Sequence, residues 1–166
     1  MLICRFHLFA DVDRGSILSL IRSNFERNLN KFPPSTKYQV EEIDFYQHDW
    51  QDNLCQELKQ VDLILAADVV YDCQITEAFF DTLESCLKQK DQRKTLVVLI
   101  ALEKRFWMDD QGQISAPSYD FFLKKLEEFS RSNMKITVEQ QPIDFPHILS
   151  HSYQREEGLV LWKLTC

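Results

Sequence analysis

Asp68 and Tyr71 are the two residues whose types and spacing are best suited to chemistry in this chain. They follow an apolar run that begins at Val61 and predicts a strand buried on both faces, as in parallel α/β sheets. Ligands of such sheets bind beyond the carboxyl ends of the strands, so a substrate could meet both side chains there. The alternative interpretation is that Asp68 caps the following turn and that Tyr71 is a core aromatic residue with its hydroxyl at the surface.

Other elements must position these two side chains. Apolar periodicity predicts helices over Ser16–Leu29, Thr76–Lys88 and Tyr119–Ser132. Strands are predicted at Leu2–Ala10, Thr95–Leu102, Ile136–Val138 and Leu159–Leu164, with strand-like residues at Tyr38–Phe45. Lys31–Lys37 and Trp107–Ser118 are predicted to be loops. The last two strands have no helix between them, which indicates an antiparallel pair.

Four segments of the sequence resemble one family of enzymes. They are VDLILAADVVYD at 61–72, HDWQDN at 48–53, LIALEKRF at 99–106 and GLVLWKL at 158–164. Together they resemble the seven-strand, S-adenosylmethionine-dependent methyltransferases that carry an Asp-x-x-Tyr motif and act mostly on protein lysines. The resemblance covers nearly the whole chain. It implies an α/β fold with a Rossmann-like, seven-strand sheet, helices on both faces and an antiparallel pair of carboxyl-terminal strands.

The resemblance also implies roles for particular residues. Asp68 and Tyr71 would be catalytic, because they would orient and desolvate the lysine amine that accepts the methyl group. Asp11 and Trp50 would hold the ribose and the adenine of S-adenosylmethionine, with the backbone near Ala67 beside the adenine. Stacking of an aromatic ring on a nucleobase is worth about 1–3 kcal/mol, so Trp50 could contribute substantially to cofactor affinity.

The cofactor residues have alternatives. Asp11 can be an ordinary turn aspartate, and Trp50 can be a partly buried loop tryptophan. Phe45, in Ile43-Asp44-Phe45, is a second candidate for the place beside the adenine, because an apparent insertion before Trp50 shifts the register.

Glu103, Lys104 and Arg105 follow the second buried run, TLVVLIAL at 95–102. This position is at the carboxyl end of a predicted strand, so the resemblance implies contacts to the substrate. The alternative is that the three charges are a solvated strand end.

The chain has only three glycines, Gly15, Gly112 and Gly158, and no two are close. A dinucleotide enzyme or a P-loop enzyme is therefore disfavoured, because both need a glycine-rich turn. In the resembling family such a turn follows the first, central strand, and this chain resembles the family from the second strand onward. We therefore expect an incomplete form, truncated at the amino terminus, that does not bind S-adenosylmethionine measurably.

Composition narrows the class of partner. A chain of 166 residues is expected to form a single domain, 1–166, and its net charge of -7 disfavours direct binding of nucleic acid. A basic protein is the better electrostatic match. Five cysteines without C-x-x-C spacing indicate reduced thiols rather than disulfides or a metal site. With no apolar run long enough to span a membrane, we expect a nuclear or cytoplasmic monomer.

Two functions remain as hypotheses. The first is a protein-lysine N-methyltransferase, with this chain an incomplete form. The second is a non-catalytic, methyltransferase-like module that binds a basic protein through its acidic surface. Cofactor binding distinguishes the two.

Overall fold

The structure is a computed structural model, and it describes residues 16–34, 36, 38, 40, 43–47, 58–90, 94–132, 135–143 and 158–166. The chain divides into two compact units, Met1–Leu54 and Cys55–Cys166. The strand predicted at Leu2–Ala10 and the predicted site residues Asp11 and Trp50 lie outside the described residues.

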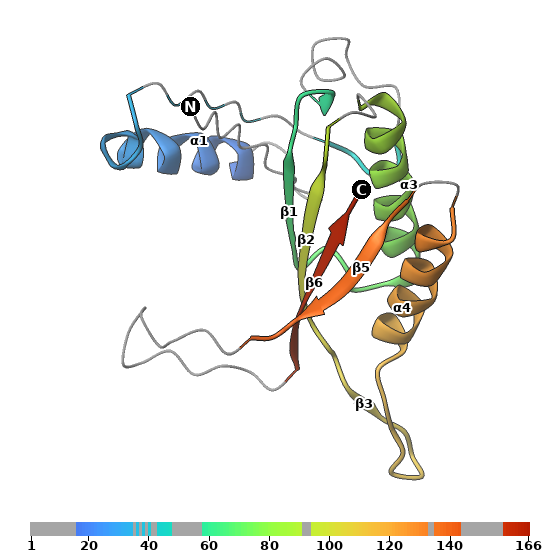
Figure 1. The fold of residues 1–166 in the computed structure, drawn as a ribbon. Coiled ribbons are helices and arrows are strands. Elements are labelled where there is room, and N and C mark those ends of the chain that lie inside the picture. Colours follow the sequence, from blue (N-terminus) through green and yellow to red (C-terminus); the bar gives the residue numbers. More distant parts are fainter. Residues whose placement is uncertain are drawn as a thin grey trace. The chain divides into compact units, whose positions relative to one another are not determined.

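The first unit is built on helix α1, Ser16–Asn28, which continues into the short 3-10 helix η1, Leu29–Lys31 (Figure 1). The ring of Phe25 stacks on Tyr38, with 5.2 Å between the ring centroids. Arg22 Nη2 donates a hydrogen bond of 2.9 Å to the carbonyl oxygen of Val40. Tyr38, Val40 and residues 43–45 form no strand, so the strand-like prediction is wrong at these positions. The physical reason is that helix α1, and not a neighbouring strand, contacts the ring of Tyr38 and the carbonyl oxygen of Val40.

Four strands form the sheet of the second unit, in the order β1, β2, β6, β5 (Figure 1). β1, Leu63–Ala67, runs parallel to β2, Val97–Glu103. β6, Leu159–Thr165, is antiparallel both to β2 and to β5, Thr137–Gln141. The fold is therefore mixed α/β, and the predicted antiparallel pair at the carboxyl terminus is confirmed.

Two helices follow the two parallel strands. α3, Cys73–Gln89, begins after Asp72, whose carboxylate accepts a hydrogen bond of 2.8 Å from the backbone N–H of Ile75. This is an N-cap, so the helix-capping role belongs to Asp72. α4, Pro117–Ser130, starts with a proline, whose fixed φ suits the first turn of a helix.

A salt bridge connects the two helices. Lys125 Nζ lies 2.6 Å from Glu77 Oε1. The hydrogen bond from Lys125 lowers the pKa of the Glu77 carboxyl, and the same bond raises the pKa of Lys125.

The core lies between this helix pair and one face of the sheet. Phe122 of α4 is fully buried, and its ring centroid is 5.8 Å from that of Phe80 in α3 and 6.2 Å from that of Trp162 in β6. The buried side chains of the strands alternate along the chain, as expected for a sheet covered on one side. They are Ile64, Ala66, Val98, Ile100, Leu102, Val160 and Leu164.

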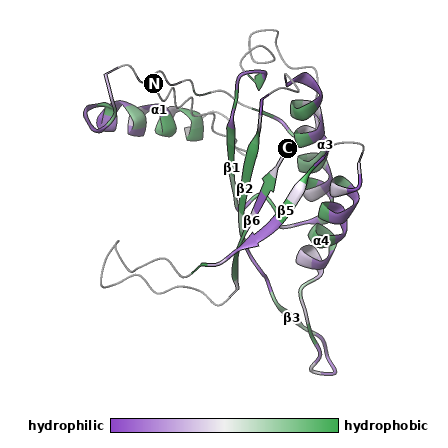
Figure 2. Ribbon diagram, in the orientation of Figure 1, coloured by the Kyte–Doolittle hydropathy of each residue, from purple (hydrophilic) through white to green (hydrophobic). Residues whose placement is uncertain are grey.

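The opposite face of β1 is exposed, with Leu63 at 46% and Leu65 at 53% of their full accessible surface. The prediction that this run is buried on both faces is therefore wrong for the structure described. β1 is one of the two edge strands of the described four-stranded sheet, and its side chains alternate between exposed and buried. Figure 2 shows that the residues of β1 are nevertheless hydrophobic, in contrast to the mostly hydrophilic residues of β5.

A buried lysine fixes the start of β1. Lys90 follows α3, and its side chain is only 4% exposed. Its Nζ donates a hydrogen bond to the carbonyl oxygen of Val61 and lies 3.3 Å from Asp62 Oδ1. A buried ammonium group needs such partners, because an unpaired charge is costly away from water. Lys90 therefore connects the end of α3 to Val61 and Asp62, the residues that precede β1.

The segment predicted to be a loop, Trp107–Ser118, contains a β-hairpin and the start of α4. β3, Trp107–Met108, pairs with β4, Ile114–Ser115, in a separate two-stranded sheet. The loop prediction is wrong because the polar residues of this segment form the turn of the hairpin, in which Gly112 has a φ of 79°.

Two features are absent from the described residues. No helix there is both long and apolar enough to cross a membrane. Nor does that part of the chain contain three or more His, Cys, Asp or Glu side chains grouped so as to hold a metal ion.

Replacing Phe122 should show how much the aromatic core contributes. We expect Phe122→Ala to lower the free energy of unfolding by about 3–5 kcal/mol, because the cavity cannot be filled by its neighbours. Phe121→Ala, at the adjacent, partly exposed position of α4, is the control and should cost clearly less. Urea unfolding measures both variants. Equal losses for the two would contradict the assignment of the core to this face, and Phe122→Leu serves if the alanine variant does not fold.

Candidate functional site

The parallel pair β1 and β2 brings the ends of two strands to one edge of the sheet. Ala67 is paired with Ala101 in register, and the backbone N–H of Asp68 donates a hydrogen bond of 2.9 Å to the carbonyl oxygen of Ala101. The ladder therefore continues one residue beyond the strand. It places Asp68 beside the residues that follow β2, among them Arg105.

Asp68 has an unusual backbone conformation. Its φ is +54°, in the left-handed region that few residues other than glycine adopt. Aspartate tolerates this region better than most side chains, yet a strained backbone of this kind costs about 1–3 kcal/mol. Such strain is concentrated at functional sites, so it is an independent reason to examine this carboxylate.

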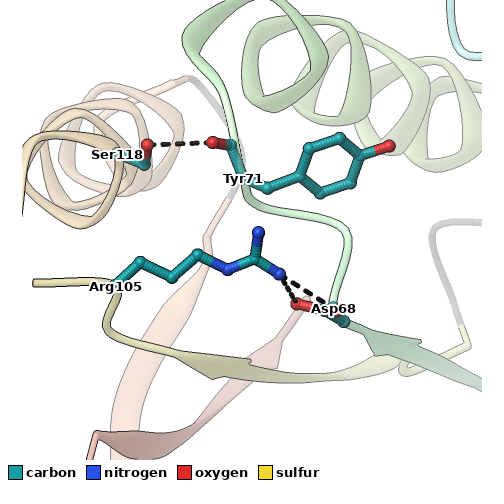
Figure 3. A network of polar contacts seen from close by, with 4 residues as sticks. All are labelled: Asp68, Tyr71, Arg105 and Ser118. Carbon is teal, nitrogen blue, oxygen red and sulfur yellow. Dashed lines mark hydrogen bonds and ion pairs between the residues drawn. The ribbon is translucent and has the colours of Figure 1, made fainter.

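Arg105 faces the carboxylate of Asp68 (Figure 3). Its Nη2 lies 3.3 Å from Oδ1 and 3.4 Å from Oδ2 of Asp68. The same guanidinium lies over the ring of Tyr71, 5.9 Å from its centroid, which is within the range of a cation–π contact. The two predicted catalytic residues and one predicted substrate residue therefore meet at a single place.

Tyr71 is held through its backbone. Ser118 Oγ, in the first turn of α4, donates a hydrogen bond of 3.0 Å to the carbonyl oxygen of Tyr71 (Figure 3). The next residue, Asp72, is fixed as the N-cap of α3. The segment from Asp68 to Asp72 is thus attached at both ends. Ser118 was missed in the sequence, where nothing relates it to a residue 47 positions earlier.

The other predicted substrate residues lie apart from this cluster. Lys104 points to α4, where its Nζ is 4.7 Å from the centroid of the Tyr119 ring. Its backbone N–H donates to the carbonyl oxygen of Gly158, at the start of β6. Glu103 is exposed and approaches Gly158 with its side chain. Of the three charged residues, only Arg105 joins Asp68 and Tyr71.

Of the predicted cofactor residues, the structure describes Ala67 and the alternative Phe45. Ala67 is exposed at the end of β1, next to Asp68. Asp11 and Trp50 belong to the residues that the structure does not describe. Phe45, the alternative to Trp50, is buried, with 3% of its surface exposed, so its ring is not open to a nucleobase in this structure.

The cluster is suited to binding a cation. An exposed carboxylate and an aromatic ring face lie within reach of one positively charged group, here the guanidinium of Arg105. Both interactions favour ammonium groups as well, since a carboxylate attracts either cation and a ring face attracts the charge of a lysine. A lysine side chain of a second protein fits the same chemistry.

The fold and the site together define a class of protein. Its members are mixed α/β domains with an Asp-x-x-Tyr segment at the carboxyl edge of a parallel strand pair. The chain belongs to the lysine methyltransferase family, whose sequence profile matches residues 9–129. The resemblance predicted from the four segments is thereby confirmed.

Two relatives are similar to much of the chain. Methyltransferase-like protein 22 of Mus musculus is 29% identical over 136 residues, which cover 70% of this chain and 34% of the relative. The Homo sapiens protein of the same name is 28% identical over 105 residues, which cover 61% of this chain and 25% of the relative. The likeness to methyltransferase-like protein 22, which the same four segments carry, is confirmed. The chain spans about a third or less of the length of these relatives.

The pair of Asp68 and Arg105 should be weakly coupled in stability. Their side chains are 63% and 48% exposed, so water screens the attraction between them. A double-mutant cycle with Asp68→Asn and Arg105→Gln, followed by urea unfolding, should give a coupling of about 0.2–1 kcal/mol. A coupling well above this range would mean that the ion pair contributes strongly to the stability of the fold. The Asp68 carboxylate would then be less available to a ligand.

Tyr119 should titrate later than an ordinary tyrosine. Burial raises the pKa of its hydroxyl, partly offset by Trp162, while Asp120 raises it further. The unfolded phenol ionises near pH 10, and the folded one at higher pH, so its contribution to stability is complete below about pH 10 and falls as the pH rises further. The tyrosinate absorbance should show one delayed group that disappears in Tyr119→Phe. An unchanged titration in that variant would contradict this assignment.

Proposed function

We propose that this chain carries the amine-binding part of a protein-lysine N-methyltransferase, with Asp68 and Tyr71 as the catalytic residues. One observation supports this most strongly: a side-chain cation, that of Arg105, already lies between the Asp68 carboxylate and the Tyr71 ring. The family supports the reaction type, since its members are lysine methyltransferases that use S-adenosylmethionine generally.

The proposed role of Asp68 follows from the charge of the acceptor. A lysine amine is protonated at neutral pH, because its ordinary pKa is about 10.4, and it must give a proton to solvent water before it can act as a nucleophile. The neutral amine then forms the N–CH3 bond as the S–CH3 bond breaks, and S-adenosylhomocysteine leaves. Asp68 attracts and orients the ammonium form. As the amine nitrogen takes up the methyl group it becomes positively charged again, and the fixed carboxylate stabilises that charge where it develops.

Tyr71 and Arg105 complete the proposed site. The Tyr71 ring lies beside the path of the lysine side chain and excludes water from it. Arg105 occupies the place of the substrate cation, so the arriving lysine displaces it or shares the carboxylate with it. The substrate contact predicted for Arg105 therefore takes the form of competition for Asp68.

S-adenosylmethionine supplies an electrophilic methyl group when it is bound. The described residues do not form a complete site for it. Gly158 is packed against the chain, since a Cβ there would lie 2.9 Å from the carbonyl oxygen of Lys104, and Gly112 lies in the hairpin. Gly158 therefore offers no open backbone surface to the methionine part, and Gly112 belongs to the turn between β3 and β4 and does not follow a strand of the main sheet. Asp11, Trp50 and Ala67 stay the proposed residues for the ribose and the adenine.

The finer description of the fold is also a proposal. The four strands of the sheet correspond to the carboxyl-terminal part of a seven-strand methyltransferase sheet, ending in its antiparallel pair. The exposed edge and face of β1 are where the resemblance expects the central strand to pair. A monomeric state, a nuclear or cytoplasmic location and a single domain over 1–166 stay predictions.

The family supports a protein substrate, and the net charge of -7 supports a basic one. A suitable set of probes is therefore a group of short peptides, each with one central lysine and basic flanking residues. A peptide with norleucine in place of the lysine controls for transfer to other groups.

The proposal is tested by methyl transfer and by cofactor affinity. Because this chain is expected not to bind the cofactor measurably, methyl transfer is measured in a longer form that also carries the family's glycine-rich turn. That form is incubated with labelled S-adenosylmethionine and the lysine peptides, and S-adenosylhomocysteine binding is measured by calorimetry for both forms. We expect Asp68→Asn to lower turnover by about 100-fold with little change in calorimetric affinity, because the lost charge acts mainly at the transition state. Asp68→Gly should give the same loss without lowering the free energy of unfolding, because glycine adopts the φ of this residue without strain.

Three outcomes contradict the proposal in different ways. Unchanged turnover in Asp68→Asn removes the catalytic role of the carboxylate. Loss of cofactor binding in that variant moves Asp68 to the cofactor side of the site. If the longer form binds S-adenosylhomocysteine but transfers no methyl group to any lysine peptide, the non-catalytic interaction module becomes the better account.

A further inference from the structure

The β3–β4 hairpin is a small ribbon that leaves the sheet at the carboxyl end of β2 (Figure 1). Its two strands are antiparallel, with Trp107 opposite Ser115 and Met108 opposite Ile114. A ribbon of this size is rarely stable by itself, so something other than the ladder must hold its shape.

The turn of the hairpin supplies this order. Asp109 Oδ1 accepts hydrogen bonds from the backbone N–H groups of Gln111, at 2.9 Å, and Gln113, at 2.8 Å. The Asp109 N–H donates in turn to the carbonyl oxygen of Gln113. Gly112, with its positive φ, lets the chain reverse between these bonds. The hairpin is therefore shaped by its own polar contacts and not by burial of its apolar side chains.

Those apolar side chains are exposed. Phe106, Trp107, Met108 and Ile114 each keep between 61% and 72% of their full accessible surface. Adjacent strand residues point to opposite faces, so Trp107 lies on one face of the ribbon while Met108 and Ile114 share the other. Four large apolar side chains within nine positions, open to solvent on a shaped ribbon, form the kind of patch that marks an interaction surface.

The hairpin begins next to the proposed amine site. Arg105, which contacts Asp68 and Tyr71, is followed directly by Phe106 and β3. A polypeptide that presents a side chain to Asp68 would therefore have its neighbouring residues within reach of the ribbon. The other exposed apolar residues named above for this unit, Leu63 and Leu65, lie on β1 of the sheet and not on this ribbon.

We propose that the hairpin, residues 106–115, is the docking arm for the protein substrate and binds an apolar side chain in the basic segment that flanks the target lysine. The proposal deepens the proposed function and rests on it. Trp107 provides the main anchor, because tryptophan is enriched among the residues that dominate binding energy, and Met108 with Ile114 provides an adaptable apolar surface.

The charges around the arm select this occupant over two others. Three carboxylates are exposed there, those of Asp109 and Asp110 in the turn and of Glu103 before the hairpin. Two cations, Lys104 and Arg105, follow Glu103, but Arg105 is paired with Asp68, so the carboxylates outnumber the remaining cation in this stretch. These carboxylates attract a basic peptide and are repelled by the anionic surface of a cytoplasmic membrane. They also oppose self-association through the arm, because two copies would bring their acidic turns together.

Fluorescence anisotropy with labelled peptides tests the docking arm without cofactor or turnover. The probes are lysine peptides of four kinds: basic with one leucine or phenylalanine, basic without an apolar residue, acidic with the apolar residue, and basic with the apolar residue but norleucine for lysine. The protein variants are the double substitution Trp107→Ala with Met108→Ala, and Leu20→Ala as a matched control. Leu20 is similarly exposed, at 58%, but lies on α1.

We expect the basic apolar peptide to bind best, and the double substitution to weaken its binding by about tenfold or more. Leu20→Ala should leave the affinity unchanged, and added salt should weaken binding to the wild type. Thermal unfolding should be similar for all variants, because the substituted side chains are exposed.

The proposal is overturned if the double substitution binds this peptide as the wild type does, or if the acidic apolar peptide binds equally well. It is also overturned if sedimentation shows a dimer, or flotation shows vesicle binding, that the double substitution abolishes. A failure of the proposed function looks different. If the proposed function fails, the arm still binds the peptide but no methyl group is transferred. If methyl groups are transferred and the double substitution does not weaken peptide binding, only the proposed role of the arm is contradicted.

Discussion

The hydrogen-bonded ladder between β1 and β2 is the constraint on which the candidate site depends. Its register pairs Ala67 with Ala101 and extends to the N–H of Asp68. In a parallel pair the two strands end at the same edge, so the charged residues that follow them must meet. A shift of one residue would turn the alternating side chains of β1 to the wrong face and would separate Asp68 from Arg105. The packing of α3 and α4 on the buried face prevents such a shift.

The ladder and its strand ends could be predicted from sequence to a useful extent. The apolar runs near 61 and 95 are long enough to identify both strands, and the charged residues after them mark the edge where a site would form. The family could be predicted as well, because the segment from Val61 to Asp72 keeps its motif residues at fixed spacing. Asp68, Tyr71 and Arg105 were each singled out, although their mutual contact depends on a strand pairing that no local pattern contains.

The errors have local physical reasons. The run at β1 is as apolar as a strand covered on both faces. Apolar side chains favour burial, but their type does not show whether a neighbouring element covers them in this structure. The hairpin was predicted as a loop because its strands have two residues each, too few to show alternation. Its order comes from Asp109 and Gly112, whose roles depend on backbone geometry. Ser118 gave no signal, because a serine after a proline at a helix start has many ordinary explanations.

The hydrogen bond from Ser118 to Tyr71 has a mechanical consequence. The hairpin leaves the sheet just after Arg105 and rejoins the domain just before Ser118, through Ala116 and Pro117. The residues at both ends of the hairpin therefore contact the segment from Asp68 to Tyr71. Arg105 forms an ion pair with Asp68, and Ser118 donates a hydrogen bond to the carbonyl oxygen of Tyr71. A load applied to the ribbon is shared between these two attachments. The backbone from Asp68 to Tyr71 is thus connected to both ends of the hairpin, so a movement of the hairpin would also act on the backbone that carries the Asp68 carboxylate.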